Sequence, residues 1–126
     1  MMVNTMTIYA IDFDGTIVQN KFSDIGPANP EAIEFIKGIQ DRGDKWILWT
    51  MREGDHLMQA MDWLAFRGLH PDAVNDNLPE LKELYGNNPR KVFANVYIDD
   101  HNAGGLQFTT PLKSQECETC KQKMEE

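Results

Sequence analysis

Four short apolar runs alternate with three segments of helical periodicity along the chain. The apolar runs are residues 7–12, 45–50, 73–75 and 92–99, and the helical segments are residues 30–42, 55–67 and 79–85. Asn29 and Gly43 are expected to cap the first helix at its two ends. Strands that alternate with helices and are apolar almost throughout are typical of a parallel sheet covered on both faces. The pattern predicts an α/β fold, a three-layer Rossmann-like sandwich with a central parallel sheet.

Polar side chains follow the end of every predicted strand. They are Asp12 and Asp14 in D-F-D-G-T, Thr50, Asn75, and the pair Asp99 and Asp100 in Y-I-D-D. Because the carboxyl ends of parallel strands meet at one edge, we expect these side chains to lie close together. Like charges about 4 Å apart cost roughly 4 kcal/mol per pair at an effective dielectric near 20. A bound cation is therefore expected, and Mg²⁺ prefers such oxygen ligands. A single Asp could equally serve as a turn or cap residue, which does not account for two pairs.

Composition narrows the classes of protein to consider. At 126 residues and 41% apolar content, the chain is expected to form one globular domain over residues 1–112, with a polar tail at 113–126. The net charge of −8 makes double-stranded nucleic acid an unlikely partner. No apolar run approaches a membrane span and no secretory signal is evident, so a cytoplasmic protein is expected. Cys117 and Cys120 lack two further cysteines for a zinc site and are expected to be reduced.

The three strand-end motifs together resemble the haloacid dehalogenase superfamily of phosphotransferases, over residues 7 to about 105. The resemblance implies that Asp12 attacks phosphorus to form an aspartyl-phosphate, and that Asp14 protonates the leaving oxygen and later activates water. It implies that Thr50 donates a hydrogen bond to a phosphoryl oxygen. It also implies a Mg²⁺ site made by Asp12, the Asp14 carbonyl, Asp99 and Asp100, and leaves open which of the last two touches the metal.

The superfamily also uses a lysine that pairs with the nucleophile and the phosphate. Lys91 is favoured here and Lys82 is the alternative. Lys91 lies eight residues before Asp99, roughly 26 Å away if the chain is extended, so it reaches the site only if residues 90–94 turn. Either lysine could instead be an ordinary solvated surface residue.

Four residues are candidates for substrate binding: Thr16, Met51, Arg52 and Asn75. Arg52 lies in T-M-R-E-G after the second strand and could clamp a substrate phosphate or carboxylate with two hydrogen bonds. T-x-R resembles the corresponding loop in nucleotidases and polynucleotide phosphatases of the superfamily. The alternative is an ion pair at the helix entry with Glu53 or Asp55. His101 could touch substrate or cap a turn.

No segment is long enough for the cap domain of larger superfamily members. Residues 15–27 have room only for a helical turn and a small hairpin. The site is expected to be open, and a homo-oligomer is one way to cover it. The sequence favours a Mg²⁺-dependent phosphomonoesterase acting on a small molecule or a polymer end, including a nucleotide or polynucleotide-end phosphate. The alternative is a non-catalytic module that binds Mg²⁺ and phosphate or a partner protein.

Overall fold

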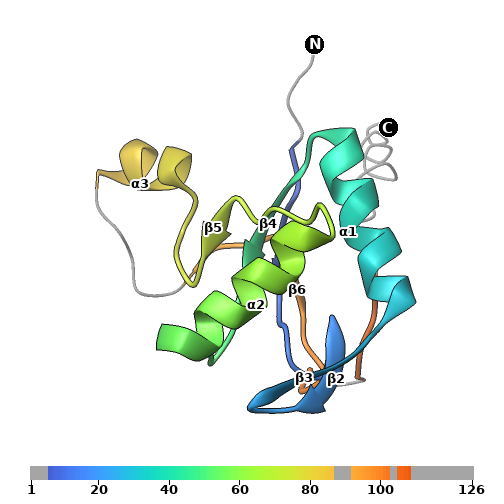
Figure 1. Cartoon of the computed structure of the whole chain (residues 1–126). Coiled ribbons are helices and arrows are strands. Elements are labelled where there is room, and N and C mark those ends of the chain that lie inside the picture. The colour runs from blue at the N-terminus through green and yellow to red at the C-terminus, as the bar shows by residue number, and fades with distance from the viewer. Residues whose placement is uncertain (1–5, 87–91, 103–104, 109–126) are drawn as a thin grey trace.

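The computed structural model describes residues 6–86, 92–102 and 105–108 (Figure 1). Its elements, in chain order, are β1 (Ile8–Ile11), β2 (Val18–Lys21), β3 (Asp24–Ala28), α1 (Pro30–Arg42), β4 (Lys45–Leu48), α2 (Gly54–Phe66), β5 (Ala73–Val74), α3 (Pro79–Tyr85) and β6 (Val96–Ile98). The predicted alternation of strands and helices is confirmed. Lys91 and the predicted tail at 113–126, with both cysteines, lie outside the described residues.

The central sheet has the order β5-β4-β1-β6, and all its neighbouring strands are parallel. Ile11 at the end of β1 pairs with Leu48 of β4 on one side and with Ile98 of β6 on the other. The three strands therefore end level, which brings the residues that follow them to one edge. Strand β1 is the central element of this α/β, Rossmann-like arrangement.

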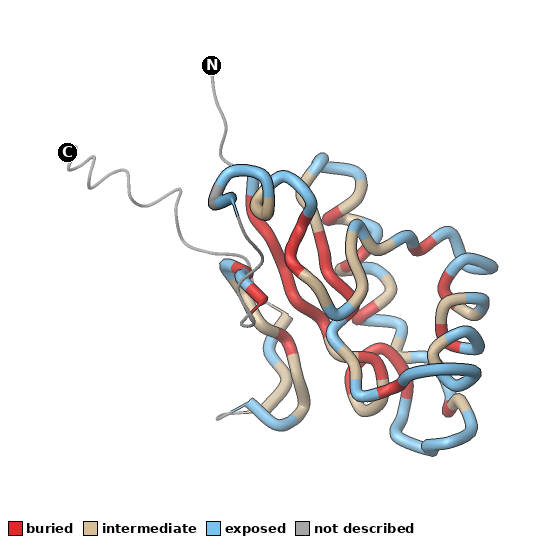
Figure 2. The backbone as a smooth tube through the Cα atoms, turned by 90° about the vertical axis from the view of Figure 1, so that its left-hand side faces the viewer, coloured by how far each residue is buried: buried red, intermediate tan, exposed pale blue. Residues whose placement is uncertain are grey.

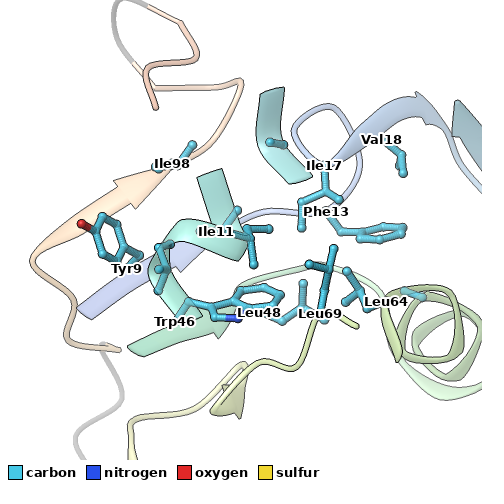
Figure 3. Close-up of a cluster of buried hydrophobic side chains, with 14 residues drawn as sticks. Tyr9, Ile11, Phe13, Ile17, Val18, Trp46, Leu48, Leu64, Leu69 and Ile98 are labelled. Atoms are coloured by element: carbon cyan, nitrogen blue, oxygen red, sulfur yellow. The ribbon is translucent and has the colours of Figure 1, made fainter. Parts of the chain in front are cut away.

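Strand β1 is buried over its whole length (Figure 2). Its alternate residues pack into two hydrophobic cores, one on each face of the sheet, and Figure 3 shows the larger of the two. Tyr9 and Ile11 join the larger core, which also holds the buried side chains of α1 and α2. Ile8 and Ala10 join the smaller core with Leu78, at the start of α3. Because both faces of the sheet are covered, every side chain of β1 packs into a core, and the sequence of β1 is therefore apolar almost throughout.

Helix α1 begins and ends at the residues that the sequence indicates. The Asn29 side chain accepts a hydrogen bond from the backbone N–H of Glu31, and Pro30 occupies the first helical position. Gly43 ends the helix in the left-handed conformation with φ of 82°. These local signals act within one turn, so the sequence alone predicts them well.

The last strand, β6, lies within residues 92–99, as predicted. Residues 92–94 precede β6 without joining it, because the Tyr97 hydroxyl donates to the Val92 carbonyl at 2.6 Å and accepts from the Ala94 N–H at 3.1 Å. The apolar run 45–50 contains two tryptophans, and the sequence predicts that both are buried in the sheet, which is wrong for Trp49. Trp49 follows the last residue of β4 and is 37% exposed at the sheet edge, while Trp46 within β4 is fully buried. No described helix is both long and apolar enough to cross a membrane.

Candidate functional site

The chain turns sharply after β1, and this turn sets the two aspartates of D-F-D-G-T. The Asp12 N–H still bonds to the Ile98 carbonyl at 3.0 Å, as a continuation of the sheet. The Phe13 carbonyl then accepts from the N–H groups of residues 16, 17 and 18, at 3.2, 2.9 and 3.2 Å. Phe13 itself is fully buried in the larger core, whereas Asp12 and Asp14 are half-buried at the edge. The buried Phe13 side chain fixes the backbone between the two aspartates, so both carboxylates stay at the end of the sheet.

Asp12 lies close to several other carboxylates. Asp12 and Asp99 both line two adjoining cavities of about 300 and 340 Å³. Burial, and after it the negative charges of Asp99, Asp100 and Asp14, raise the pKa of Asp12 to about 7, against a lowering hydrogen bond from the Phe13 backbone. No cation among the described residues forms an ion pair with Asp12. A carboxylate in this setting favours either a proton or a bound cation.

Asp99, Asp100 and His101 form a compact group of ligating atoms after β6. One atom of each lies within 4.8 Å of the others. The Asp100 Oδ1 atom is buried and accepts no hydrogen bond, although His101 Nδ1 lies 3.3 Å from it. Burial, and after it the neighbouring Asp99 carboxylate, raise the pKa of Asp100. An orphaned buried oxygen among half-buried carboxylates fits a hard divalent cation, so these residues could bind a metal.

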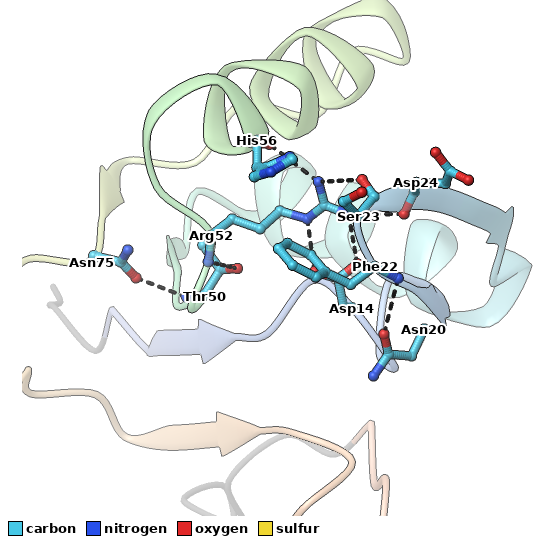
Figure 4. A network of polar contacts seen from close by, with 9 residues as sticks. All are labelled: Asp14, Asn20, Phe22, Ser23, Asp24, Thr50, Arg52, His56 and Asn75. Carbon is cyan, nitrogen blue, oxygen red and sulfur yellow. Dashed lines mark hydrogen bonds and ion pairs between the residues drawn. The ribbon is translucent and has the colours of Figure 1, made fainter.

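Asp14 is held by Arg52 in a bidentate ion pair (Figure 4). Arg52 Nε donates to Asp14 Oδ2 at 2.7 Å and Nη2 donates to Asp14 Oδ1 at 2.8 Å. The remaining guanidinium hydrogens go to the carbonyls of His56, Ser23 and Asp24, at 3.2, 3.5 and 3.0 Å. Arg52 is only 1% exposed, and its guanidinium lies 5.2 Å from the centre of the Phe13 ring and 5.0 Å from that of Phe22.

The structure therefore gives Arg52 neither of the two roles that the sequence suggests. All five N–H donors are in use, so no free donor remains to clamp a phosphate. Its ion-pair partner is Asp14, 38 residues away in sequence, and neither Glu53 nor Asp55. Arg52 is a positioning residue for Asp14 and for the hairpin β2–β3. One feature of the sequence indicates this ion pair: an arginine follows Thr50 at the sheet edge where Asp14 is also expected.

Asn75 positions Thr50. The Asn75 Oδ1 atom accepts from the Thr50 backbone N–H at 2.7 Å, and the residue has a φ of 50°. Asn tolerates this left-handed conformation better than most residues, which explains its use after β5. The Thr50 hydroxyl accepts from the Arg52 N–H at 3.1 Å and lines both cavities, so its own proton is available to a ligand there.

Two Asn75 variants separate these contributions. Asn75→Gly keeps the positive φ and loses the side-chain bond to Thr50, so we expect a loss of about 1 kcal/mol in the free energy of unfolding. Asn75→Ala adds the left-handed strain of a side chain, for a further loss of about 1 kcal/mol. Urea titration of both variants measures the difference. Equal stability of the two would show that φ at this position carries no cost.

The other predicted site residues divide into those at the cavities and those away from them. Met51 is 97% exposed and lines both cavities. Thr16 is buried and lines a separate depression of about 270 Å³ beside the start of α1, so the structure does not bring it to the carboxylates. The reason is the turn at Gly15, which reverses the chain before Thr16. Lys82 Nζ forms an ion pair with Asp76 Oδ2 at 2.9 Å and lines neither cavity.

Gly15 allows the turn and the close approach of Asp100. It has a φ of 90°, and a Cβ atom there would lie 2.7 Å from Asp100 Cγ and closer still to Asp100 Oδ2. We expect Gly15→Ala to cost about 1–3 kcal/mol more than Gly43→Ala, because Gly43 has a similar φ of 82° but open space around it. Chemical denaturation of both variants makes the comparison. If both lose the same stability, Asp100 does not pack against Gly15.

Comparisons with known proteins give one informative relative. A conserved protein from Bacteroides thetaiotaomicron has a solved structure that superposes with a TM-score of 0.71 at 37% sequence identity, over 94% of this chain and 93% of that one. No protein-family model and no curated protein matches the chain. The agreement over nearly the full length of both chains indicates common ancestry and a shared fold.

Proposed function

The chain belongs to the family of the conserved Bacteroides thetaiotaomicron protein, and from its carboxylate-lined edge we propose that it is a Mg²⁺-dependent phosphomonoesterase working through phospho-Asp12. The observation that carries the proposal is the environment of Asp12. This carboxylate is crowded by Asp99, Asp100 and Asp14, and faces two cavities that also contain Thr50. Perturbed carboxylates that converge on a cavity are typical of a reaction centre. The order of the motifs along the chain also resembles that of the haloacid dehalogenase superfamily.

The metal-binding residues in this proposal are Asp12, Asp99 and Asp100, together with the Asp14 carbonyl. Mg²⁺ bound there would neutralise the crowded carboxylates and the charge of the phosphoryl group. The orphaned Asp100 oxygen is one atom whose bonding such an ion could complete.

The chain's own groups suffice to balance the reaction. An Asp12 oxygen bonds to phosphorus while the bond from phosphorus to the ester oxygen breaks, and Asp14, which must be protonated before this step, gives that oxygen its proton, so an alcohol leaves. Water then attacks the phosphorus, the bond to Asp12 breaks, and Asp14 takes the proton from the water. Inorganic phosphate leaves with both aspartates restored. The Thr50 hydroxyl donates to a phosphoryl oxygen throughout.

The Arg52 pair is compatible with an acid–base role for Asp14. Each carboxylate oxygen offers two lone pairs, and Arg52 occupies one on each. The carboxylate keeps room for one proton, and Asp14 lines the cavity of about 300 Å³. Arg52 holds the carboxylate of Asp14 in one orientation at this cavity.

Phosphate release tests the proposal directly. Sugar phosphates, nucleotides, phosphopeptides and oligonucleotides with a 3′- or 5′-phosphate are incubated with the protein in Mg²⁺ or in EDTA. We expect release that needs both Mg²⁺ and Asp12. Beryllium fluoride with Mg²⁺ should raise the melting temperature of the wild type, as a mimic of phospho-Asp12, and leave Asp12→Asn unchanged. No release from any substrate, with no response to beryllium fluoride, would favour a non-catalytic binding module.

Metal removal should make stability depend on pH. The folded pKa of Asp12 is about 7 against an ordinary value of 3.8, so the folded state holds a proton that the unfolded state releases between these pH values. The metal-free protein should therefore lose stability as pH rises from about 4 to about 7, by on the order of 1 kcal/mol after allowance for solvent screening. Melting temperatures in EDTA across this range test the sign, and Mg²⁺ at pH 8 should restore the loss. A rise in stability over the same range would contradict the crowded-carboxylate description.

A further inference from the structure

The two cavities differ in which of them contains Asp14. Both are lined by Asp12, Thr50, Met51 and Asp99. Asp14 lines the cavity of about 300 Å³ beside the hairpin β2–β3, here termed the hairpin-side cavity, and does not line the other. Since Asp14 protonates the leaving oxygen under the proposed function, the leaving group lies in the hairpin-side cavity.

Two large apolar side chains line this cavity from different segments. Phe22 at the tip of the hairpin is 58% exposed, and Met51 in the loop before α2 is 97% exposed. The Phe22 ring is held in place, 5.0 Å from the Arg52 guanidinium and 5.1 Å from the centre of the His56 ring. Arg52 also fixes the backbone beside it through the carbonyls of Ser23 and Asp24 (Figure 4). Exposed apolar side chains beside a cavity, one of them an aromatic ring held by its neighbours, are typical of a ligand site.

The charges at the hairpin-side cavity argue against a second anionic group on the ligand. Among the described residues that line it, only Arg52 and His101 can carry a positive charge. Arg52 uses all its donors on protein oxygens, and His101 Nδ1 lies between Asp99 and Asp100, 3.4 and 3.3 Å from their oxygens. Asn20 accepts from the Phe22 N–H at 3.3 Å, which leaves its amide nitrogen for a neutral polar group.

We propose that the hairpin-side cavity is a subsite for an uncharged aromatic leaving group, whose ring packs against Phe22 and Met51. This inference rests on the proposed phosphomonoesterase activity and names the class of substrate. A volume of about 300 Å³ is at the lower end of ligand pockets and suits a single ring. Aromatic contact with Phe22 separates such substrates from aliphatic phosphates of equal charge.

Calorimetry with stable phosphonates tests the subsite without turnover. In Mg²⁺, benzylphosphonate should bind the wild type about tenfold more tightly than cyclohexylmethylphosphonate or 4-carboxybenzylphosphonate. Phe22→Ala and Met51→Ala should each reduce the preference for benzyl over cyclohexylmethyl to within about twofold. Phe22→Leu, which keeps apolar packing on Arg52, should lose the preference with an unchanged melting temperature. Phe66→Ala is the matched control, since Phe66 is 88% exposed at the end of α2 and lines neither cavity.

Phosphate release from benzyl phosphate and cyclohexylmethyl phosphate separates this inference from the proposed function. Equal kcat/KM for the two esters, with equal binding of the two phosphonates, overturns the aromatic subsite and leaves the phosphatase intact. Selective binding of benzylphosphonate without phosphate release from either ester supports the subsite and overturns the catalytic proposal. Binding of neither phosphonate also overturns the subsite.

Discussion

Asp12→Asn is expected to lower phosphate release by at least about 10⁴-fold, because the amide cannot attack phosphorus. The same variant should be more stable than the wild type when metal is absent. The wild-type carboxylate is half-buried and lies near three other carboxylates, which is why its pKa is about 7. Asparagine has nearly the same shape and carries no charge, so the repulsion disappears. Activity and stability should move in opposite directions, as expected for a functional residue.

The pH dependence makes this prediction specific to Asp12. The stability gain of Asp12→Asn in EDTA should be smallest near pH 4, should grow through about pH 7, and should level off above it, where the wild-type Asp12 is ionised in both states. Melting curves of the two proteins at matched pH give the difference. Asp41→Asn is a suitable control, because Asp41 is exposed on α1 and lines neither cavity. A destabilised Asp12→Asn protein at pH 8 without metal would contradict this account.

Arg52→Met is expected to cost about 3–5 kcal/mol in the free energy of unfolding. The substitution leaves the Asp14 carboxylate, whose side chain is 14% exposed, without its bidentate partner. It also removes the donors to three backbone carbonyls that hold the hairpin and the first turn of α2. Such a loss is a large share of the 5–15 kcal/mol that stabilises a typical domain. Chemical denaturation measures it, and any remaining folded protein should have lost activity with Asp14 misplaced.

A double-mutant cycle isolates the ion pair from the rest of the Arg52 contacts. Asp14→Asn combined with Arg52→Met removes both charges, so the double variant should be more stable than the sum of the single losses predicts. Arg67→Met is the control for removal of an arginine near α2, since Arg67 is exposed and its side chain, among the described residues, contacts the carbonyl and the ring of Trp63. We expect that control to lose less than about 1 kcal/mol. Strict additivity in the cycle would mean that Asp14 and Arg52 do not interact.

The order and type of the main elements follow from the sequence because their causes are local. The first helix starts at Pro30 after the Asn29 cap and ends at Gly43, as its signals indicate. The parallel sheet follows from the alternation of buried strands and helices, and the rule for strand ends brings Asp12 and Asp99 to the same cavities. The length of residues 15–27 predicts a small hairpin, which forms as β2 and β3 and extends to Ala28.

The direction of each side chain beyond the strand ends was decided only by the tertiary structure. Beyond the end of a strand, side chains no longer alternate between the two faces of the sheet, so contacts with distant parts of the chain decide where each side chain points. For this reason Thr16 turns away behind Gly15, Trp49 is exposed, and Asn75 bonds to the Thr50 backbone. The buried pair of Asp14 and Arg52 joins segments 38 residues apart, and only folding brings them within 2.7 Å. The sequence by itself determined which groups meet at this edge, while the tertiary structure decided which of them are paired and which remain available to a ligand.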